Sequence, residues 1–105
     1  MKRFYAGTFI NREELRKVGI DYPIKLEYYK TNQSENLLEE MNTKYGIEIV
    51  KTSYINECVE VENIKIEEII EDESIVNQIL DKLKRNEVTP VSAQYVVEDL
   101  LKEMV

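Results

Sequence analysis

Carboxylates are the side chains that this chain supplies most abundantly for chemistry. Adjacent acidic residues occur at Glu39-Glu40, Glu67-Glu68, Glu71-Asp72-Glu73 and Glu98-Asp99. Two carboxylates that converge in a cleft suffice for glycoside hydrolysis, and such oxygen ligands bind hard cations. However, the chain has no Asp-x-Asp-x-Asp-Gly loop, and 105 residues leave little material for a cleft once a core is built. An enzyme that uses paired carboxylates is therefore the third of three functional hypotheses.

Histidine is absent from the sequence, and its absence excludes several kinds of active site. A Ser-His-Asp or Cys-His device, a His-ligated metal site and an imidazole acid or base all require this residue. The single Cys58 is flanked by Glu57 and Glu60, whose negative charge disfavours the thiolate. The three glycines are far apart and form no phosphate-binding loop. We expect no enzymatic activity, no cofactor and no bound metal.

The charge of the chain is acidic and unevenly distributed. Its net charge is −7. Residues 1–30 carry 7 basic and 4 acidic residues, whereas residues 31–105 carry 7 basic and 17 acidic residues. An acidic field repels phosphate backbones, so we expect no nucleic-acid partner, with the basic N-terminal stretch as the only feature that favours one.

A contact surface for another protein is the remaining possibility. Tyr28 and Tyr29 point to opposite faces of a predicted strand, so one of them lies outside the core, and exposed tyrosine is enriched at interfaces. An acidic stretch follows downstream and can serve as a partner-binding patch. The candidate contact residues are Tyr29, Glu60, Glu62, Glu67, Glu68 and Glu71. The structural alternatives are a half-buried Tyr29 and a solvated helix entry over residues 67–73, where acids favour the positive end of the helix dipole.

The chain lacks the signals of secretion and membrane insertion. One cysteine cannot form an internal disulfide, and the basic N-terminus is followed by Asn11-Arg12-Glu13-Glu14 rather than by an apolar segment. No apolar run approaches the roughly 18 residues that span a bilayer. We expect a cytoplasmic protein without a membrane partner.

The first half of the chain predicts a strand, a short helix and further strands. Residues 3–10 favour a strand, and a helix follows between Asn11 as N-cap and Gly19 as the residue after its end. Apolar residues alternate with polar ones over 24–29 and over 44–53, as in strands with one buried face. A turn at Asn56-Glu57 leads into a return strand, where Ile64 and Ile66 fall out of phase with Val59 and Val61. This phase change predicts a bulge or the end of strand pairing near Asn63.

The last third predicts two helices in a hairpin. Asp72 is a suitable N-cap for a first helix whose last turn is basic, and Asn86 suits the residue after its end. Thr89 is the N-cap of a second helix, with Pro90 at its first position. The predicted fold is one α+β domain over 1–105, a small antiparallel sheet of three to four strands with this helical hairpin packed on one face. Its parts are a strand-helix-strand unit (1–30), a mobile excursion (32–43), a hairpin (44–66) and two helices (72–104).

Three short stretches carry a resemblance to a known family. They are Lys44-Tyr45-Gly46-Ile47-Glu48-Ile49-Val50-Lys51, Asn86-Glu87-Val88-Thr89-Pro90-Val91 and Val96-Val97-Glu98-Asp99-Leu100-Leu101. At this spacing they resemble a family of small uncharacterised proteins of Gram-positive bacteria, classed as a domain of unknown function. The resemblance covers about residues 45–101 and does not reach the first 30 residues. Where many members carry a histidine after the Pro-Val pair, this chain has Ser92, which argues against an essential imidazole there.

The leading functional hypothesis is a non-enzymatic interaction or regulatory module with an unidentified protein partner. It would act through a sheet edge, through the acidic region 57–73, or by self-association into a homo-oligomer through exposed strands. The alternative is an acidic inhibitor whose carboxylates imitate nucleic-acid phosphates in a basic cleft of another protein.

Overall fold

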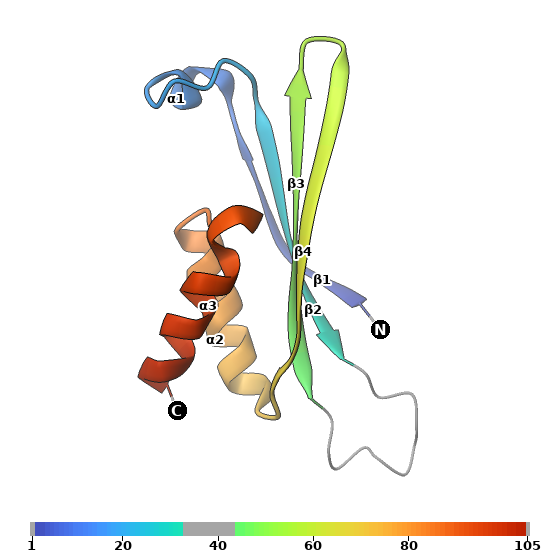
Figure 1. Ribbon diagram of the computed structural model, residues 1–105, viewed down its shortest axis with the longest axis vertical. Coiled ribbons are helices and arrows are strands. Elements are labelled where there is room, and N and C mark those ends of the chain that lie inside the picture. The colour runs from blue at the N-terminus through green and yellow to red at the C-terminus, as the bar shows by residue number, and fades with distance from the viewer. Residues whose placement is uncertain (1, 33–43, 105) are drawn as a thin grey trace.

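The computed structural model describes residues 2–32 and 44–104, except the side chain of Glu68. Four strands and three helices follow one another along this part of the chain (Figure 1). They are β1 (Lys2–Ile10), α1 (Arg12–Arg16), β2 (Ile24–Asn32), β3 (Tyr45–Ile55), β4 (Cys58–Ile70), α2 (Glu73–Arg85) and α3 (Pro90–Met104). Most of the predicted excursion over 32–43 lies outside the described residues, and Asn32 is the last residue of β2.

The four strands form one antiparallel sheet in the order β1-β2-β3-β4. Helices α2 and α3 lie together on one face of this sheet, which we call the covered face (Figure 1). Alternate residues of the two central strands point to this face and are buried: Ile24, Leu26, Tyr28, Ile47 and Ile49. The predicted α+β fold, with its helical hairpin on one face of the sheet, is confirmed.

Helix α2 supplies the largest share of the helical core. Its buried residues recur at steps of three and four, as an amphipathic helix requires: Val76, Ile79, Leu80 and Leu83. The Asp72 side chain caps the helix by accepting hydrogen bonds from the backbone N–H groups of Ser74 and Ile75 at 2.9 and 3.4 Å. Helix α3 adds Ala93 and Val97 to the same core.

The end of α2 differs in one residue from the prediction. Glu87, and not Asn86, adopts the left-handed conformation, with φ 51°. The Val88 N–H donates to Leu83 O at 3.0 Å and the Glu87 N–H to Lys84 O at 3.1 Å, the bond pair of a Schellman motif. Asn86 remains at φ −93° and donates its side-chain N–H to Lys82 O at 3.0 Å. The difference follows from Val88, which is buried. The residue just before Val88 must take the left-handed conformation, and that residue is Glu87.

Replacing Glu87 with glycine should stabilise the fold, because glycine has no Cβ to oppose positive φ and no charge at the negative end of the helix dipole. We expect the free energy of unfolding to rise by about 0.5 to 1 kcal/mol in urea titrations. Asn86→Gly is the matched control, since that residue has ordinary φ and its side chain makes a hydrogen bond; it should not stabilise. If Asn86→Gly raised the free energy of unfolding instead, the left-handed residue that ends the helix would be Asn86 and not Glu87.

The first helix is held as the sequence predicts. The Asn11 side-chain oxygen accepts the Glu14 N–H at 2.9 Å, which confirms the N-cap. Gly19 has φ 87°, and Ile20 N–H donates to Leu15 O at 2.9 Å, so this helix also ends in a Schellman motif. Leu15 is buried there and anchors α1 to the core.

The bulge predicted near Asn63 does not exist. Strand β4 pairs regularly with β3 from Cys58 to Ile66, and the register shifts only beyond Ile66. The apolar pattern changes phase because the β3–β4 hairpin projects past α2 and α3 (Figure 1). Near its tip the covered face has neither α2 nor α3 over it and carries Glu60 and Glu62, while Val59 and Val61 point to the other face.

A buried hydroxyl ties the sheet to the turn between α2 and α3. Tyr28 is fully buried, and its hydroxyl donates to Val88 O at 2.9 Å. Burial, helped by the negative charge of Glu87, raises the pKa of Tyr28 above its ordinary value of 10.0. The native state therefore favours the neutral phenol, and its contribution to stability is complete below pH 10 and is lost as pH rises further.

Tyr28→Phe should lower the free energy of unfolding at neutral pH by about 1 to 2 kcal/mol, since it leaves the Val88 carbonyl without its donor. Above pH 10 the wild-type protein should lose stability more steeply than this variant. Denaturant titrations between neutral pH and pH 11 measure both effects. If the free energies of unfolding of the two proteins fell in parallel as pH rises, ionisation of Tyr28 would not be coupled to unfolding. A residual slope is expected in the variant, because the pKa of Tyr5 is also raised, mainly by its hydrogen bond to Asp81.

Candidate functional site

The second face of the sheet has no helix over it among the residues that the structure describes (Figure 1). We call it the open face. Residues that are partners in an antiparallel ladder point to the same side, so the strand register defines its members. They are Lys2, Phe4, Gly7 and Phe9 of β1, Lys25, Glu27, Tyr29 and Thr31 of β2, Gly46, Glu48, Val50, Thr52 and Tyr54 of β3, and Val59, Val61, Asn63 and Lys65 of β4.

Exposed large apolar side chains gather on the open face. Phe4 is 55% exposed, Phe9 60%, Val59 59% and Val61 63%. The remaining exposed large apolar side chains of the described chain, Val18, Val91 and Tyr95, lie after α1 and on α3. Single exposed apolar residues are ordinary, but a group that shares one sheet face marks a surface made for contact.

Aromatic pairs organise this surface at two places. Phe4 and Tyr29 meet edge to face, with ring centroids 5.7 Å apart, and Lys2 Nζ lies 4.5 Å from the centroid of the Tyr29 ring. Phe9 and Tyr54 approach at 6.4 Å, beside the valines of β4. Because the rings are held by strands and by each other, the surface is already in a fixed shape before any partner arrives.

The carboxylates of the open face are paired within the chain. Glu48 is 4% exposed, lies 3.5 Å from Lys2 Nζ, and accepts the Asn63 side-chain N–H at 3.1 Å. Glu27 lies 3.6 Å from Lys25 Nζ and accepts the Tyr29 hydroxyl at 2.8 Å. That hydrogen bond is the main reason why the pKa of Tyr29 is raised. A partner on this face therefore finds apolar groups to cover and no unpaired carboxylate to neutralise.

The structure does not bring the predicted contact residues together. Tyr29 is a partly buried member of the open face. Glu60 and Glu62 point to the opposite side, where their ladder partners are Ser53 and Lys51. Glu67 is exposed near the end of β4, Glu71 is exposed in the turn before α2, and the side chain of Glu68 lies outside the described residues.

Sequence reasoning missed the apolar residues of the open face. Val59 and Val61 alternate with Glu60 and Glu62 as strand residues do. Phe4 and Phe9 have opposite phases in the sequence, and they share the open face because the register of β1 shifts between Phe4 and Ala6. The available signal was that β1 and the hairpin each carry apolar residues in both phases of the alternation. Too many large side chains then compete for the single covered face, and the surplus must point to the other side.

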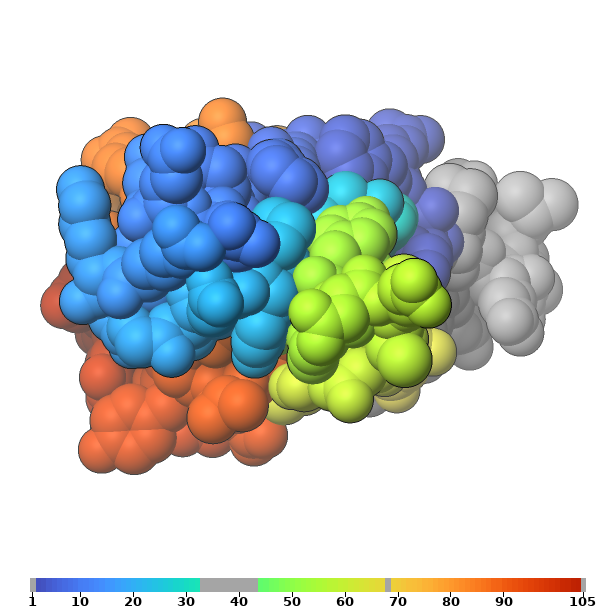
Figure 2. Space-filling view, turned by 90° about the horizontal axis from the view of Figure 1, so that it is seen from above, coloured from blue at the N-terminus to red at the C-terminus, as the bar shows by residue number. Residues whose placement is uncertain are grey.

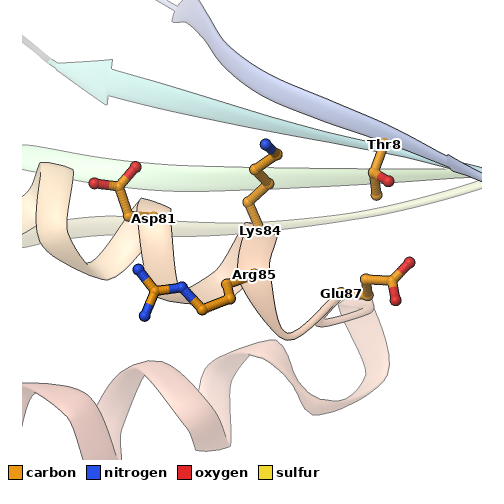
Figure 3. Close-up of a pocket in the computed structure, with 5 residues that line it drawn as sticks. All are labelled: Thr8, Asp81, Lys84, Arg85 and Glu87. Carbon is orange, nitrogen blue, oxygen red and sulfur yellow. The ribbon is translucent and has the colours of Figure 1, made fainter.

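A shallow pocket of about 500 Å³ lies between β1 and the end of α2. It is lined by Thr8, Asp81, Lys84, Arg85 and Glu87. Figure 3 shows Asp81 and Glu87 at opposite ends of this group, and Asp81 accepts the Tyr5 hydroxyl at 2.8 Å. The two acids do not converge on one point, so the pocket lacks the carboxylate pair that the enzyme hypothesis requires.

The part of the chain that the structure describes holds neither a metal-binding cluster nor a membrane-spanning helix. Within 2–32 and 44–104, no group of three or more cysteine or acidic side chains is placed to hold a metal ion. No helix in this part of the chain is both long and apolar enough to cross a membrane.

Comparison with known proteins extends the resemblance seen in the sequence. No curated protein and no solved structure matches the chain. One family model matches residues 8–103, so the similarity includes most of the N-terminal strand-helix-strand unit, which the sequence resemblance left out. On this match, the chain belongs to DUF6514, a family of unknown function.

Proposed function

We propose that this protein is a non-enzymatic interaction module that binds another protein surface through the open face of its sheet. The observation that carries the proposal is the gathering of Phe4, Phe9, Val59 and Val61 on the one sheet face that no described element covers. A sheet normally buries one face and solvates the other with polar residues. Here the second face carries large apolar residues as well.

The exposed area is sufficient for binding. The four side chains present on the order of 400 Å² of apolar surface, within the range of the largest, often functional, patch of a monomeric protein. Burying that area is worth about 10 kcal/mol before the entropy of association is subtracted. The free energy that is left after this subtraction supports a specific complex whose affinity depends on apolar contact.

The same surface separates this proposal from the phosphate-mimic hypothesis. An acidic mimic would act through residues such as Glu60 and Glu62, which lie on the other side of the β3–β4 hairpin. Its binding would weaken steeply as salt is added, because charge would carry it. Binding through the open face should change little, since its carboxylates are already paired within the chain.

Site-specific photo-crosslinking in the native host tests the proposal. A photoreactive phenylalanine analogue at Phe9 should yield a covalent adduct with a protein, because that position lies in the open face. The matched control is the same analogue at Tyr95, an exposed aromatic residue of α3 that is 75% exposed. Adducts at Phe9 that are absent at Tyr95 support the proposal. No adduct at Phe9, or equal adducts at both positions, would contradict it.

We also propose a bacterial, cytoplasmic setting. The resemblance to proteins of Gram-positive bacteria supports the bacterial part. The exposed, unpaired thiol of Cys58 fits a reducing compartment. Cell fractionation with an antibody to the native protein checks the location, and recovery from the medium or the membrane pellet would contradict it.

A further inference from the structure

We propose that the partner on the open face is a second copy of this chain, so that two sheets pack face to face in a two-fold symmetric dimer. This inference rests on the proposed function of the open face and names its occupant. It places helices on the outside and two sheets in the middle, so each sheet becomes covered on both sides.

The distribution of charge favours a second copy. Each chain carries a net charge of −7, so two copies repel through most of their surfaces. The open face is an exception, with three lysines, Lys2, Lys25 and Lys65, against Glu27 and Glu48. Its net charge is therefore +1 in an acidic molecule. The rest of the chain then carries −8, so two copies repel less through their open faces than through their acidic surfaces.

Ion pairs within each chain also reduce the repulsion between like charges across a two-fold interface. A two-fold axis brings like residues near one another, and uncompensated like charges across an interface cost several kcal/mol. Lys2 with Glu48 and Lys25 with Glu27 form local pairs within each chain, at 3.5 and 3.6 Å. Each copy thus presents two charge pairs to the other, with Lys65 as the remaining charge of the face.

The apolar groups have the arrangement that a two-fold interface needs. Phe4 with Tyr29 lies toward one end of the face, and Phe9 with Tyr54 and the β4 valines lies toward the other. Phe4 and Phe9 are five residues apart on β1, or about 15 Å at the usual rise of a strand. An axis in the interface plane and across the strands places each apolar group opposite the other group of the second copy.

The size of the face agrees with that of a weak, reversible dimer interface. Four strands spaced about 4.8 Å apart and paired over nine residues make a surface of roughly 15 by 30 Å. That outline is about 450 Å² for each copy, or roughly 900 Å² for two, which is the size of a weak, reversible interface. Two sheets that pack in this way keep their strands within about 30° of each other, about 10 Å apart.

Sedimentation equilibrium of the full chain from about 1 to 500 µM tests the dimer. The wild-type protein should sediment with twice the chain mass of 12.4 kDa at the upper end. Phe9→Lys and Val61→Lys should each weaken association by roughly 100-fold, because a lysine is driven into an apolar interface. Both positions are exposed in the single chain, so circular dichroism and urea titrations should show an unchanged fold.

Tyr95→Lys and Val91→Lys are the matched controls, since both residues are exposed apolar positions of α3 away from the open face. Both variants should remain dimers. A wild-type monomer at 500 µM would overturn the dimer, as would dissociation by the α3 variants with none by the open-face variants.

The two proposals fail in distinguishable ways. A wild-type monomer whose Phe9 crosslinker captures a different protein would remove the second copy as the occupant and leave the interaction surface standing. A monomer whose Phe9 crosslinker captures nothing would remove both. An adduct at Phe9 with twice the chain mass, formed by a wild-type dimer, supports both.

Discussion

Leu80→Ala is expected to lower the free energy of unfolding by about 3 kcal/mol. Leu80 is fully buried on α2, in the core that joins this helix to the sheet. Truncation removes apolar burial and leaves a cavity that surrounding side chains fill only in part, a change that costs about 2 to 5 kcal/mol in protein cores. Urea titration followed by circular dichroism measures it, and the loss is large against the 5 to 15 kcal/mol that stabilises a typical domain.

The control for this variant is Val91→Ala on α3, because Val91 is 86% exposed. Its stability should change by less than about 0.5 kcal/mol. The pair tests whether α2 is truly docked on the sheet. If Leu80→Ala were as mild as Val91→Ala, the helical hairpin would not pack on the sheet as described.

Gly46→Ala is expected to destabilise the protein by about 2 to 3 kcal/mol. A Cβ at this position would lie 2.5 Å from Ile66 O and 2.6 Å from Thr31 Oγ1. The threonine can rotate, but the Ile66 oxygen is backbone, and it belongs to β4 at the point where the register shifts. The ladder between β3 and β4 would have to open there, so hydrogen exchange of the β4 amides should accelerate along with the loss of stability.

Gly7→Ala is the matched substitution for comparison. Its Cβ would meet Leu26 O and the Phe4 ring at 3.3 Å, and the exposed Phe4 can move aside. We expect a loss below about 1 kcal/mol. Equal losses at the two glycines would show that close backbone approach is not what requires Gly46.

Local signals predicted most of the fold. The alternation of Ile24, Leu26 and Tyr28 places all three in the core, and Asn11 and Asp72 cap the helices that they were expected to cap. These features depend on residues close in sequence, so one chain suffices to find them. Glu87 was missed because its positive φ follows from the burial of Val88, a tertiary contact that overrides the preference of asparagine for this conformation.

The candidate site could not be predicted from the same signals. The alternation of Val59 and Val61 with Glu60 and Glu62 predicts one apolar and one acidic face for this strand. It does not predict which of the two faces the helices cover. The answer depends on where α2 and α3 end relative to the β3–β4 hairpin, which projects beyond them (Figure 1). Figure 2 looks onto that end, where α1 and the hairpin form the surface. The acidic residues were conspicuous in the sequence, yet the structure distributes them over several surfaces.

Nuclear Overhauser spectroscopy on a mixture of isotope-labelled and unlabelled chains can report only contacts between copies, so it shows directly whether the open face is the dimer interface. We expect intermolecular contacts at Phe4, Phe9, Val59 and Val61 and none at Val91 or Tyr95, in the described part of the chain. Intermolecular contacts confined to α3, or their complete absence at a concentration of about 500 µM, would contradict the claim that the open face is where this protein binds a second copy of itself.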